Sequence, residues 1–356
     1  MRYKLLGRSG LRVSEICLGT MTFGTDWPIG VDEATARAVF DAFREAGGNF
    51  LDTANRYTDG SSEEFVGRFV AAERDRWVLG TKYTLATDPS DVNACGNHRK
   101  NLVQALEASL RRLRTDRVDV FWVHAWDALT PVEEVMRALD DQVRLGKVLY
   151  VGISDAPAWW IARANTLAEL RNWSPFAAVQ LKYSLLERTA ERELLPMAQA
   201  LDLAVTTWGS LGGGFLSGKY HDAQGRRRPK ADVESRREGV GERESEREDA
   251  VVRAVMDVAR ELERPAAHVA LTWVRQRPGV MIPVVGARTA EQLRENLGCL
   301  DVRLDDDQLR RLDEAGAIDL GFPRAFLRQD AIRRLVHGDD PERVDDHRRG
   351  RRGPTI

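Results

Sequence analysis

Four ionisable side chains lie near the ends of three apolar runs of the chain. Asp52 ends the run within "NFLDTA", and Tyr57 follows it closely. Lys82 ends "WVLGTK", and His124 ends "VDVFWVH". Asp52 or His124 alone could be structural, as a helix cap or a core histidine. A lysine that ends a buried strand, in contrast, must be paired or functional. These residues are therefore candidates for a shared site.

Together the four groups could donate a proton to a carbonyl oxygen. A phenol has a reference pKa of about 10, which is too high for it to give up its proton readily at neutral pH. A nearby ammonium group favours the phenolate, so we expect Asp52 to hold Lys82 charged and aimed at Tyr57. His124 would hydrogen-bond the substrate oxygen and orient it. Such a site needs only a hydride donor to reduce a carbonyl.

The elements that position these residues are short apolar runs that alternate with segments of helical periodicity. Helices are predicted over residues 32–47, 97–113 and 131–146. This alternation predicts a parallel sheet covered by helices, either a closed (β/α)8 TIM barrel or an open doubly wound sheet. The count of eight runs and the lack of GxGxxG after the first run favour the barrel. In such a barrel, the ends of all strands open onto one face.

The predicted organisation is one barrel domain over residues 1–317 and a C-terminal tail over 318–356. The first 14 residues are expected to form a β-hairpin with "GRSG" as its turn. Residues 222–250 hold eight basic and nine acidic residues, so they are interpreted as a solvated loop or as a lid over the site. In the tail, "LGFPRAFL" is expected to pack, whereas the charged end is expected to be disordered.

Composition indicates an ordinary globular protein. The chain has 356 residues, 43% of them hydrophobic and 30% charged, with a net charge of −2, so nothing indicates binding to nucleic acid or to an anionic membrane. Cys17, Cys95 and Cys299 are far apart without a CxxC pair, which argues against a disulfide framework or a zinc site. The N-terminus lacks the apolar core of a signal peptide, and no run approaches transmembrane length. We expect a cytoplasmic protein without a metal site.

The sequence resembles the aldo-keto reductase superfamily from "YKLLGRSGLRVSEICLGTMTFG" to "LRENL" near residue 297. The family motif around the catalytic acid and tyrosine matches "LDTANRY", its lysine matches "GTKY" and its histidine matches "WVHAWD". The resemblance implies NADPH-dependent reduction of aldehydes or ketones to alcohols. It makes Tyr57 the general acid, which Lys82 and Asp52 tune, and it gives His124 the task of orienting the carbonyl.

The resemblance also implies that NADPH, favoured over NADH, lies extended across the same face. Ser154 and Asp155 in "GISD" match the nicotinamide-carboxamide segment, where many members carry Asn in place of Asp155. A carboxylate cannot donate to the carboxamide oxygen, so Gln180 is expected to supply that donor. Trp208 is expected under the nicotinamide ring.

Phosphate-binding positions are expected after the last two strands. The resemblance makes Leu211 and the following glycines a backbone cradle for the pyrophosphate, and "GGFLSGKY" is not a P-loop because Tyr220 replaces its Ser/Thr. Arg288 is the expected partner of a 2′-phosphate, although it could also simply cap a surface helix. The full set of expected cofactor-binding residues is Gly19, Thr20, Met21, Ser154, Asp155, Gln180, Trp208, Ser210, Leu211, Gly213, Gly286, Arg288, Gln292 and Asn296.

Three aromatic residues are expected to line an apolar substrate pocket beside Tyr57: Phe23, Trp27 and Trp126. Each of them could instead be a core residue. Two other functions stay open. The chain could be a redox-sensing regulatory subunit that binds NADPH with slow turnover. It could also form a Schiff base through Lys82, but a neighbouring carboxylate would raise the pKa of that lysine and so disfavour it as a nucleophile.

Overall fold

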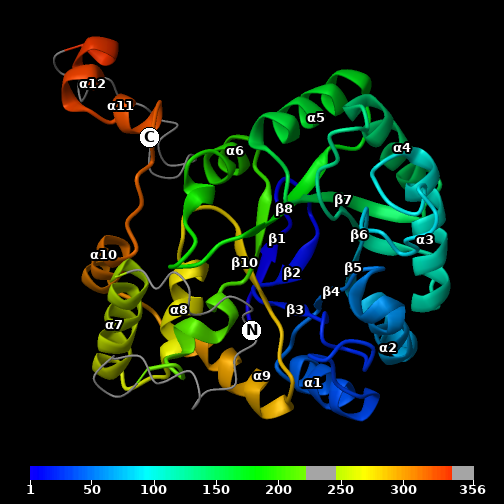
Figure 1. Cartoon of the computed structure of the whole chain (residues 1–356), viewed down its shortest axis with the longest axis horizontal. Coiled ribbons are helices and arrows are strands. Elements are labelled where there is room, and N and C mark those ends of the chain that lie inside the picture. Colours follow the sequence, from blue (N-terminus) through cyan, green and yellow to red (C-terminus); the bar gives the residue numbers. More distant parts are fainter. Residues whose placement is uncertain (222–245, 339–356) are drawn as a thin grey trace.

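Eight parallel strands close into a barrel in the computed structural model, which describes residues 1–221 and 246–338 (Figure 1). Neighbouring strands around the barrel follow chain order, and the last strand pairs with the first. The strands are β3 (Cys17–Gly19), β4 (Phe50–Asp52), β5 (Val78–Tyr83), β6 (Val118–Val123), β7 (Val148–Ser154), β8 (Phe176–Lys182), β9 (Ala204–Trp208) and β10 (Met281–Val285). The predicted (β/α)8 barrel is confirmed, and the open doubly wound sheet is excluded.

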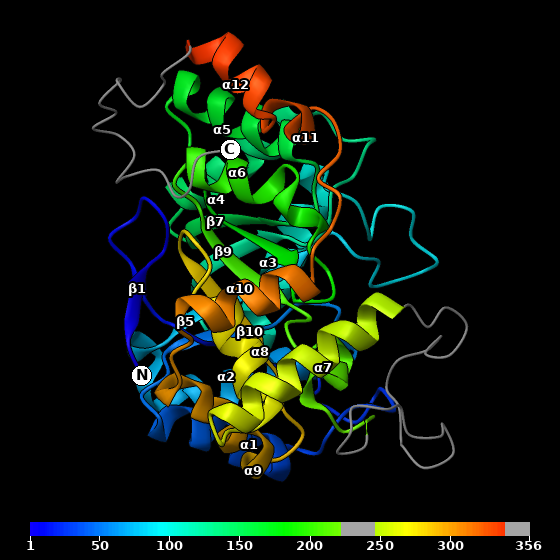
Figure 2. The ribbon, with the colours of Figure 1, turned by 90° about the vertical axis from the view of Figure 1, so that its left-hand side faces the viewer.

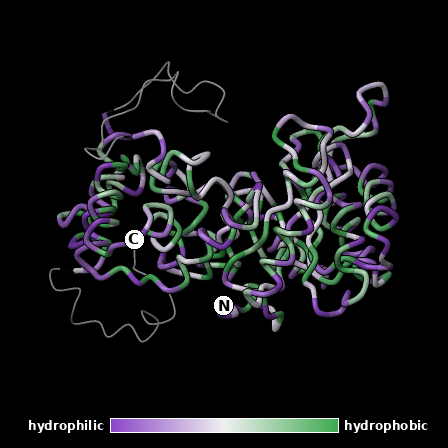
Figure 3. Tube along the Cα trace, turned by 90° about the horizontal axis from the view of Figure 1, so that it is seen from below, coloured by the Kyte–Doolittle hydropathy of each residue, from purple (hydrophilic) through white to green (hydrophobic). Residues whose placement is uncertain are grey.

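The strands are apolar along their length because both of their faces are covered. Every residue of β5 and β6 is buried. Inside the barrel the indole of Trp122 fills the space beside Gly80 and Gly152, where an added Cβ would lie 2.9 Å and 2.3 Å from it. Figure 3 shows hydrophilic positions mainly at the periphery, on the outer helices. The packed interior fixes the strand ends that carry the site.

The predicted helices are confirmed, with boundaries set by their caps. Helix α1 spans Glu33–Glu45 after Asp32, whose carboxylate accepts from the backbone N–H of Thr35 at 2.8 Å. Helix α3 spans Arg99–Leu113 and α4 spans Val132–Arg144. The other helices around the barrel are α2 (Ser61–Val70), α5 (Ala158–Arg171), α6 (Leu194–Ala200), α7 (Glu246–Glu261), α8 (Ala266–Arg275), α9 (Ala290–Leu297) and α10 (Asp306–Ala315).

The N-terminal hairpin lies at one end of the barrel, as the side view in Figure 2 shows. Strands β1 (Tyr3–Leu5) and β2 (Arg12–Ser14) are antiparallel. The backbone N–H of Arg8 in their turn donates to the carbonyl of Asp202, just before β9, at 2.9 Å. The predicted hairpin is confirmed, and it leaves the opposite face of the barrel open.

The charged segment is shorter than predicted. Helix α7 begins at Glu246, so the expectation that residues 246–250 belong to a loop is wrong. Acidic side chains in its first turn, Glu246, Glu248 and Asp249, favour a helix N-terminus through the helix dipole. Buried valines from Val251 onward then pack the helix against the barrel side. Residues 222–245, and with them the possible lid, lie outside the described part of the chain.

The described part of the tail forms an arm beyond α10. It contains the short helices α11 (Arg324–Leu327) and α12 (Asp330–His337), which lie outside the ring of helices at the upper left of Figure 1. Phe322 is 84% exposed and Phe326 is 42% exposed, so the expectation that "LGFPRAFL" packs is wrong for both. Polar contacts hold the arm instead, such as the guanidinium of Arg192 donating to the carbonyl of Asp319 at 2.8 Å. Residues 339–356 lie outside the described ranges.

Candidate active site

Lys82 is the centre of the candidate site. Its ammonium donates to Oδ2 of Asp52 at 2.5 Å, to the carbonyl of Thr53 at 3.0 Å and to Oη of Tyr57 at 2.9 Å. The side chain of Lys82 is fully buried, and that of Asp52 is almost so. All three donors of the ammonium are therefore used within the protein. The predicted meeting of Asp52, Tyr57 and Lys82 is observed.

Strand register and one tight turn produce this arrangement. Asp52 pairs with Gly80 on β5, so Lys82 lies two residues further along at the same rim. The turn after β4 then brings the phenol back over the strand end, with the N–H of Tyr57 donating to the carbonyl of Ala54 at 3.1 Å. Thr58 adopts the left-handed conformation, with φ of 43°, which reverses the chain immediately after the phenol.

Charge keeps Lys82 protonated, and burial keeps Tyr57 protonated. Burial alone would lower the pKa of Lys82, but the Asp52 carboxylate and Tyr57 outweigh it and raise that pKa above its ordinary value. Burial also raises the pKa of Tyr57, and the opposing effect of Lys82 does not reverse the shift. Lys82 favours the phenolate, as expected, but burial has the larger effect on the pKa of Tyr57. Tyr57 keeps its proton at neutral pH, and a charged Lys82 is a poor Schiff-base nucleophile.

His124 lies at the end of β6 and faces the phenol. Its ring centroid is 5.8 Å from that of Tyr57, edge to face at 83°. Its backbone N–H donates to the carbonyl of Tyr83 at 3.1 Å, which fixes the strand end. Burial, and then the charge of Lys82, lower the pKa of His124 to about 3. The imidazole is therefore neutral, and it can hydrogen-bond a carbonyl oxygen without adding a second charge.

The neutrality of His124 can be measured directly. In the folded protein we expect its imidazole to show no protonation in an NMR titration from pH 8 to pH 5, because its pKa is lowered to about 3. Its signals can be assigned by their loss in His124→Gln. A His124 midpoint near 6.5 would contradict this electrostatic picture.

The expected carboxamide-binding residues lie across the barrel mouth from Tyr57. Gln180 is buried, and its side-chain N–H donates to Oδ1 of Asp52 at 3.0 Å. Asp155 follows β7 with φ of 45°, and its Oδ1 accepts the indole N–H of Trp208 at 3.2 Å. Partial burial raises the pKa of Asp155, and the bond from Trp208 opposes that shift. Ser154 is buried at the end of β7.

Trp208 offers an exposed aromatic surface at this rim. Its side chain is 37% exposed, and the ammonium of Lys182 lies 5.5 Å from a ring centroid. The backbone after it bends through Gly209 and then through three consecutive glycines, Gly212, Gly213 and Gly214, all with positive φ. A Cβ at Gly213 would meet no atom within 4 Å, so open space lies beside this backbone. The hydroxyl of Ser210 is buried and pairs with that of Thr207 at 3.0 Å, whereas Leu211 is half-buried.

The remaining expected cofactor positions surround the ends of β3 and β10. A Cβ on Gly286 would lie 3.4 Å from the carbonyl of Gly19, so the two backbones approach closely. Thr20 is buried, and its hydroxyl donates to the carbonyl of Asp52 at 3.0 Å, so this side chain supports β4. Met21 is 42% exposed beside it.

Arg288 does not cap α9, because Thr289 does. The hydroxyl of Thr289 accepts the backbone N–H of Gln292 at 3.1 Å. The backbone N–H of Arg288 donates to Oε1 of Gln292 at 2.9 Å, whereas its side chain is exposed and forms no hydrogen bond or ion pair within residues 1–221 and 246–338. Asn296 lies on the same helix and is buried. An exposed guanidinium beside Gly286 suits a phosphate.

The model of the Aldo/keto reductase family matches residues 15–317, which include every one of these positions. The chain belongs to the aldo/keto reductase family. It is therefore an oxidoreductase that acts on carbonyl or alcohol groups.

The similar proteins include named reductases and dehydrogenases. Norsolorinic acid reductase of Aspergillus flavus is 39% identical, over 91% of this chain and 83% of its own length. An aryl-alcohol dehydrogenase of Pestalotiopsis microspora is 37% identical, over 92% and 85%. Aryl-alcohol dehydrogenase [NADP(+)] of Phanerodontia chrysosporium is 36% identical, over 92% and 89%. The first name refers to a reduction and the other two refer to alcohols.

The aromatic rim of this aldo/keto reductase differs from the prediction at one position. Phe23 is fully buried, with its ring 6.2 Å from that of Phe69, so it packs in the core. Trp27 is half-buried under the guanidinium of Arg56. Trp126 is half-buried and meets Trp159 edge to face at 6.1 Å. Sequence reasoning missed Trp159, which is 59% exposed. The adjacent pair "WW" after "GISDAP" was its only signal.

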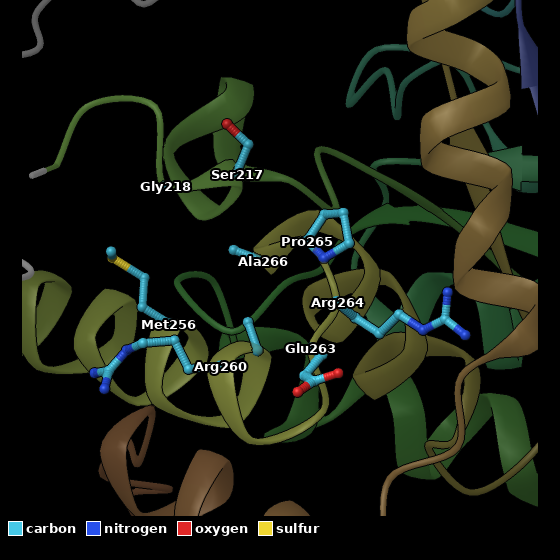
Figure 4. A pocket seen from close by; sticks show the side chains of 9 residues that line it. Ser217, Gly218, Met256, Arg260, Glu263, Arg264, Pro265 and Ala266 are labelled. Carbon is cyan, nitrogen blue, oxygen red and sulfur yellow. The ribbon is translucent and has the colours of Figure 1, made fainter. Parts of the chain in front are cut away.

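A separate groove lies between the end of α7, the start of α8 and the turn after β9 (Figure 4). It has a volume of about 540 Å³ and is lined by Ser217, Gly218, Met256, Ala259, Arg260, Glu263, Arg264, Pro265 and Ala266. None of the predicted site residues lines it.

Over residues 1–221 and 246–338 there is also no cluster of three His, Cys, Asp or Glu side chains that could hold a metal ion. Nor does any helix in these ranges have the length and apolarity to cross a membrane.

Proposed function

We propose that the enzyme reduces aromatic aldehydes or ketones to alcohols with NADPH, reversibly, and that Tyr57 is the general acid. The observation that carries this proposal is the buried ammonium of Lys82, which lies 2.5 Å from Asp52 and 2.9 Å from Oη of Tyr57. An aldo/keto reductase needs a proton donor that is protonated at rest and stabilised once it has given up its proton. Burial keeps the phenol of Tyr57 protonated at rest, and the contact with Lys82 stabilises the phenolate that forms.

The proton transfer follows from the charges. Bound NADPH would supply the hydride to the carbonyl carbon. Negative charge then grows on the carbonyl oxygen, and Tyr57 Oη gives its proton to that oxygen. The resulting phenolate lies beside the ammonium of Lys82, which favours this ionised form. Asp52 keeps Lys82 charged throughout. The only group of the site whose charge changes is therefore Tyr57, which gives its proton to the substrate.

His124 would orient the same oxygen. Because its pKa is lowered to about 3, the ring is neutral at physiological pH. A neutral N–H still stabilises growing negative charge by hydrogen bonding. An imidazolium in this position would instead compete with Lys82 as the counter-charge and disturb the protonation of Tyr57.

The residues across the barrel mouth fit a dinucleotide. The exposed ring of Trp208 could lie against the nicotinamide, with Ser154 and Asp155 beside the carboxamide. Open space beside Gly213 leaves room for the pyrophosphate next to the backbone. The exposed guanidinium of Arg288 could bind the 2′-phosphate that distinguishes NADPH from NADH. The name of the relative from Phanerodontia chrysosporium, which includes NADP(+), supports this choice.

Aromatic side chains at the rim support an aromatic substrate. Trp126 and Trp159 form an edge-to-face pair, and Trp159 is more than half exposed. Aromatic rings pair favourably in offset and edge-to-face geometries. The names of the relatives that act on aryl alcohols point the same way.

The test follows NADPH absorbance with benzaldehyde derivatives and with aliphatic aldehydes of similar size. We expect turnover with a preference for the aryl substrates, expressed in kcat/KM. Equal kcat/KM values for the two sets would contradict the aromatic class. Tight NADPH binding with no turnover of any carbonyl would contradict the catalytic proposal and favour the regulatory alternative.

Arg288 should set the choice of cofactor. We expect Arg288→Ala to weaken NADPH binding by about 10- to 100-fold, because a charge-assisted bond to phosphate contributes about 1.5–3 kcal/mol. NADH binding should change little, since NADH lacks the 2′-phosphate. Titration calorimetry measures both, with Arg294→Ala, on the helix α9 that follows Arg288, as the matched control. Equal losses for the two cofactors would contradict a 2′-phosphate role for Arg288.

A further inference from the structure

Gln180 connects opposite sides of the barrel. It lies on β8, and its side-chain N–H donates to Oδ1 of Asp52 on β4 at 3.0 Å. In the order of the closed barrel, β4 and β8 are separated by three strands on either side. Gln180 is 3% exposed and Asp52 is 2% exposed, so solvent has almost no access to the bond. A hydrogen bond across the barrel mouth can form only if the two side chains lie at the same level along the barrel axis.

The two oxygens of Asp52 therefore have different partners. Oδ2 accepts from the ammonium of Lys82 at 2.5 Å, and Oδ1 accepts from Gln180. Donation from an amide N–H stabilises the charged form of a carboxylate and fixes the plane of its carboxyl group. We propose that Gln180 is a positioning residue for the proton-donating site, one that holds Asp52 charged and aligned with Lys82 and Tyr57. This inference rests on the proposed function of Tyr57.

The physical reason is the burial of Asp52. A buried carboxylate oxygen without a donor is costly, and the carboxyl group can escape that cost by turning or by taking up a proton. Either change weakens the charge that faces Lys82. The carboxylate of Asp52 is the main favourable charge that keeps the buried Lys82 protonated. Losing the Gln180 bond therefore disturbs Tyr57 through Asp52 and Lys82, without any contact between Gln180 and the phenol.

Gln180 also fixes the opposite half of the site through its backbone. Its carbonyl accepts the backbone N–H of Asp155 at 3.2 Å, and in strand register it pairs with Ser154. Asp155 in turn holds the indole of Trp208. Gln180 thus contacts both halves of the site. Its side chain holds Asp52, which supports Lys82 and Tyr57, and its backbone holds Asp155, which supports Trp208.

Few groups near Asp52 change their protonation between pH 5 and pH 9, the range of the tests of this inference. The titratable side chains around it are Cys17 on β3, Tyr57 after β4, Lys82 on β5, His124 after β6 and Asp155 after β7. Burial raises the pKa of the Cys17 thiol well above its ordinary value. The pKa values of Tyr57 and Lys82 are also raised, and that of His124 is about 3. Asp155 is unchanged in all of the Gln180 variants, so any titration of Asp155 affects their pH profiles equally.

Two substitutions of Gln180 with opposite expected effects test the inference through the pH profile of kcat/KM. In Gln180→Leu the donor is absent, so Asp52 takes up a proton more easily. The acid limb should then move upward by about 1–2 pH units, the shift that corresponds to one hydrogen bond to a charged group.

In Gln180→Glu the introduced carboxyl can donate to Asp52 only while it keeps its own proton. Two adjacent carboxyl groups cannot both ionise easily, so the introduced group should have a raised pKa. We expect a new loss of kcat/KM on the alkaline side of the profile, where that proton leaves. If both variants keep the wild-type pH profile, Gln180 does not position Asp52 and the inference is wrong.

A stability series tests the same bond without any turnover. The introduced carboxyl of Gln180→Glu has an unfolded pKa of about 4.3, and a raised one in the folded state. Its favourable contribution is complete below the unfolded pKa and is lost as pH rises through the folded pKa. The difference in Tm between this variant and the wild type should therefore grow between pH 5 and pH 9.

The same substitution in an Asp52→Asn background is the matched control, because burial is kept and the facing charge is removed. We expect the pH-dependent part of the Tm difference to shrink clearly in that background. An equal pH dependence in both backgrounds would overturn the Gln180–Asp52 coupling. If the wild type turns over no carbonyl, the proposed function fails, and this series still decides the coupling.

Discussion

Tyr57→Phe should lower kcat for carbonyl reduction by about 10²- to 10⁴-fold, the usual contribution of a general acid. The substitution removes only the hydroxyl, which contacts Lys82 at 2.9 Å, and it keeps the ring that faces His124. The affinity for NADPH should change little, because the hydroxyl of Tyr57 contacts Lys82 and is not one of the proposed dinucleotide contacts. Steady-state kinetics together with a Kd for NADPH separate the two effects.

Tyr150→Phe is the matched control for the loss of a phenol hydroxyl. Tyr150 lies on β7 near the opposite end of the barrel, half-buried and far along the strand from Ser154. It should keep wild-type kcat. If Tyr57→Phe and Tyr150→Phe have the same kcat, the proton comes from another group, and the assignment of Tyr57 as the acid is wrong.

Lys82→Met should damage both stability and activity. Removal of the ammonium leaves the carboxylate of Asp52 buried without its opposite charge, and breaking a buried ion pair in this way costs about 3–5 kcal/mol. Activity should fall as well, because the phenolate of Tyr57 loses the cation beside it. Urea unfolding measures the free energy of unfolding, and the deficit should shrink as pH falls and the carboxyl takes up a proton.

The control for Lys82→Met is Lys147→Met. Lys147 forms an ion pair with Glu107, and both side chains are more than a third exposed. Such surface pairs contribute about 0–1 kcal/mol, so this variant should unfold almost like the wild type and keep its activity. A similar deficit in both variants, or a deficit in Lys82→Met that does not depend on pH, would show that the buried pair is not the source of the instability.

Much of the fold and the catalytic core could be predicted from sequence because both depend on local signals. Eight apolar runs alternating with helical segments leave few topologies open. In a barrel the strand ends share one face, so Asp52, Lys82 and His124 could be placed together from their positions in three successive runs. Tyr57 needed only a short turn after its strand. Each of these inferences uses residues that are close in the chain or adjacent in strand order.

Other features depended on distances that a sequence does not encode locally. The bond between Gln180 and Asp52 joins strands on opposite sides of the barrel, so it requires the closed register of every strand between them. The direction of the shift in the pKa of Tyr57 depends on how far burial outweighs the charge of Lys82, and that balance is a property of packing. Phe23 and Trp159 show the same limit, because apolar type alone does not tell whether a ring turns inward.

The boundaries of the charged segment and of the tail were harder to predict for a different reason. The residues around Glu246 are highly charged, and high charge indicated a loop, but acidic residues also favour a helix N-terminus. In "LGFPRAFL" the apolar content suggested packing, yet the arm is held to the barrel by Arg192 and its phenylalanines stay exposed. Composition describes the average environment of a segment and leaves its individual contacts open.

The most direct test of the central claim is the transfer of deuterium from NADPH to product. Each of the two 4-deuterated diastereomers of NADPH would be incubated with the enzyme and an aryl aldehyde, and the alcohol would be analysed by mass spectrometry. We predict that one diastereomer passes its deuterium to the carbonyl carbon in the wild type, and that the labelled alcohol forms about 10²- to 10⁴-fold more slowly in Tyr57→Phe. An alcohol without deuterium from either diastereomer, or bound NADPH with no alcohol formed, would contradict hydride transfer at this site.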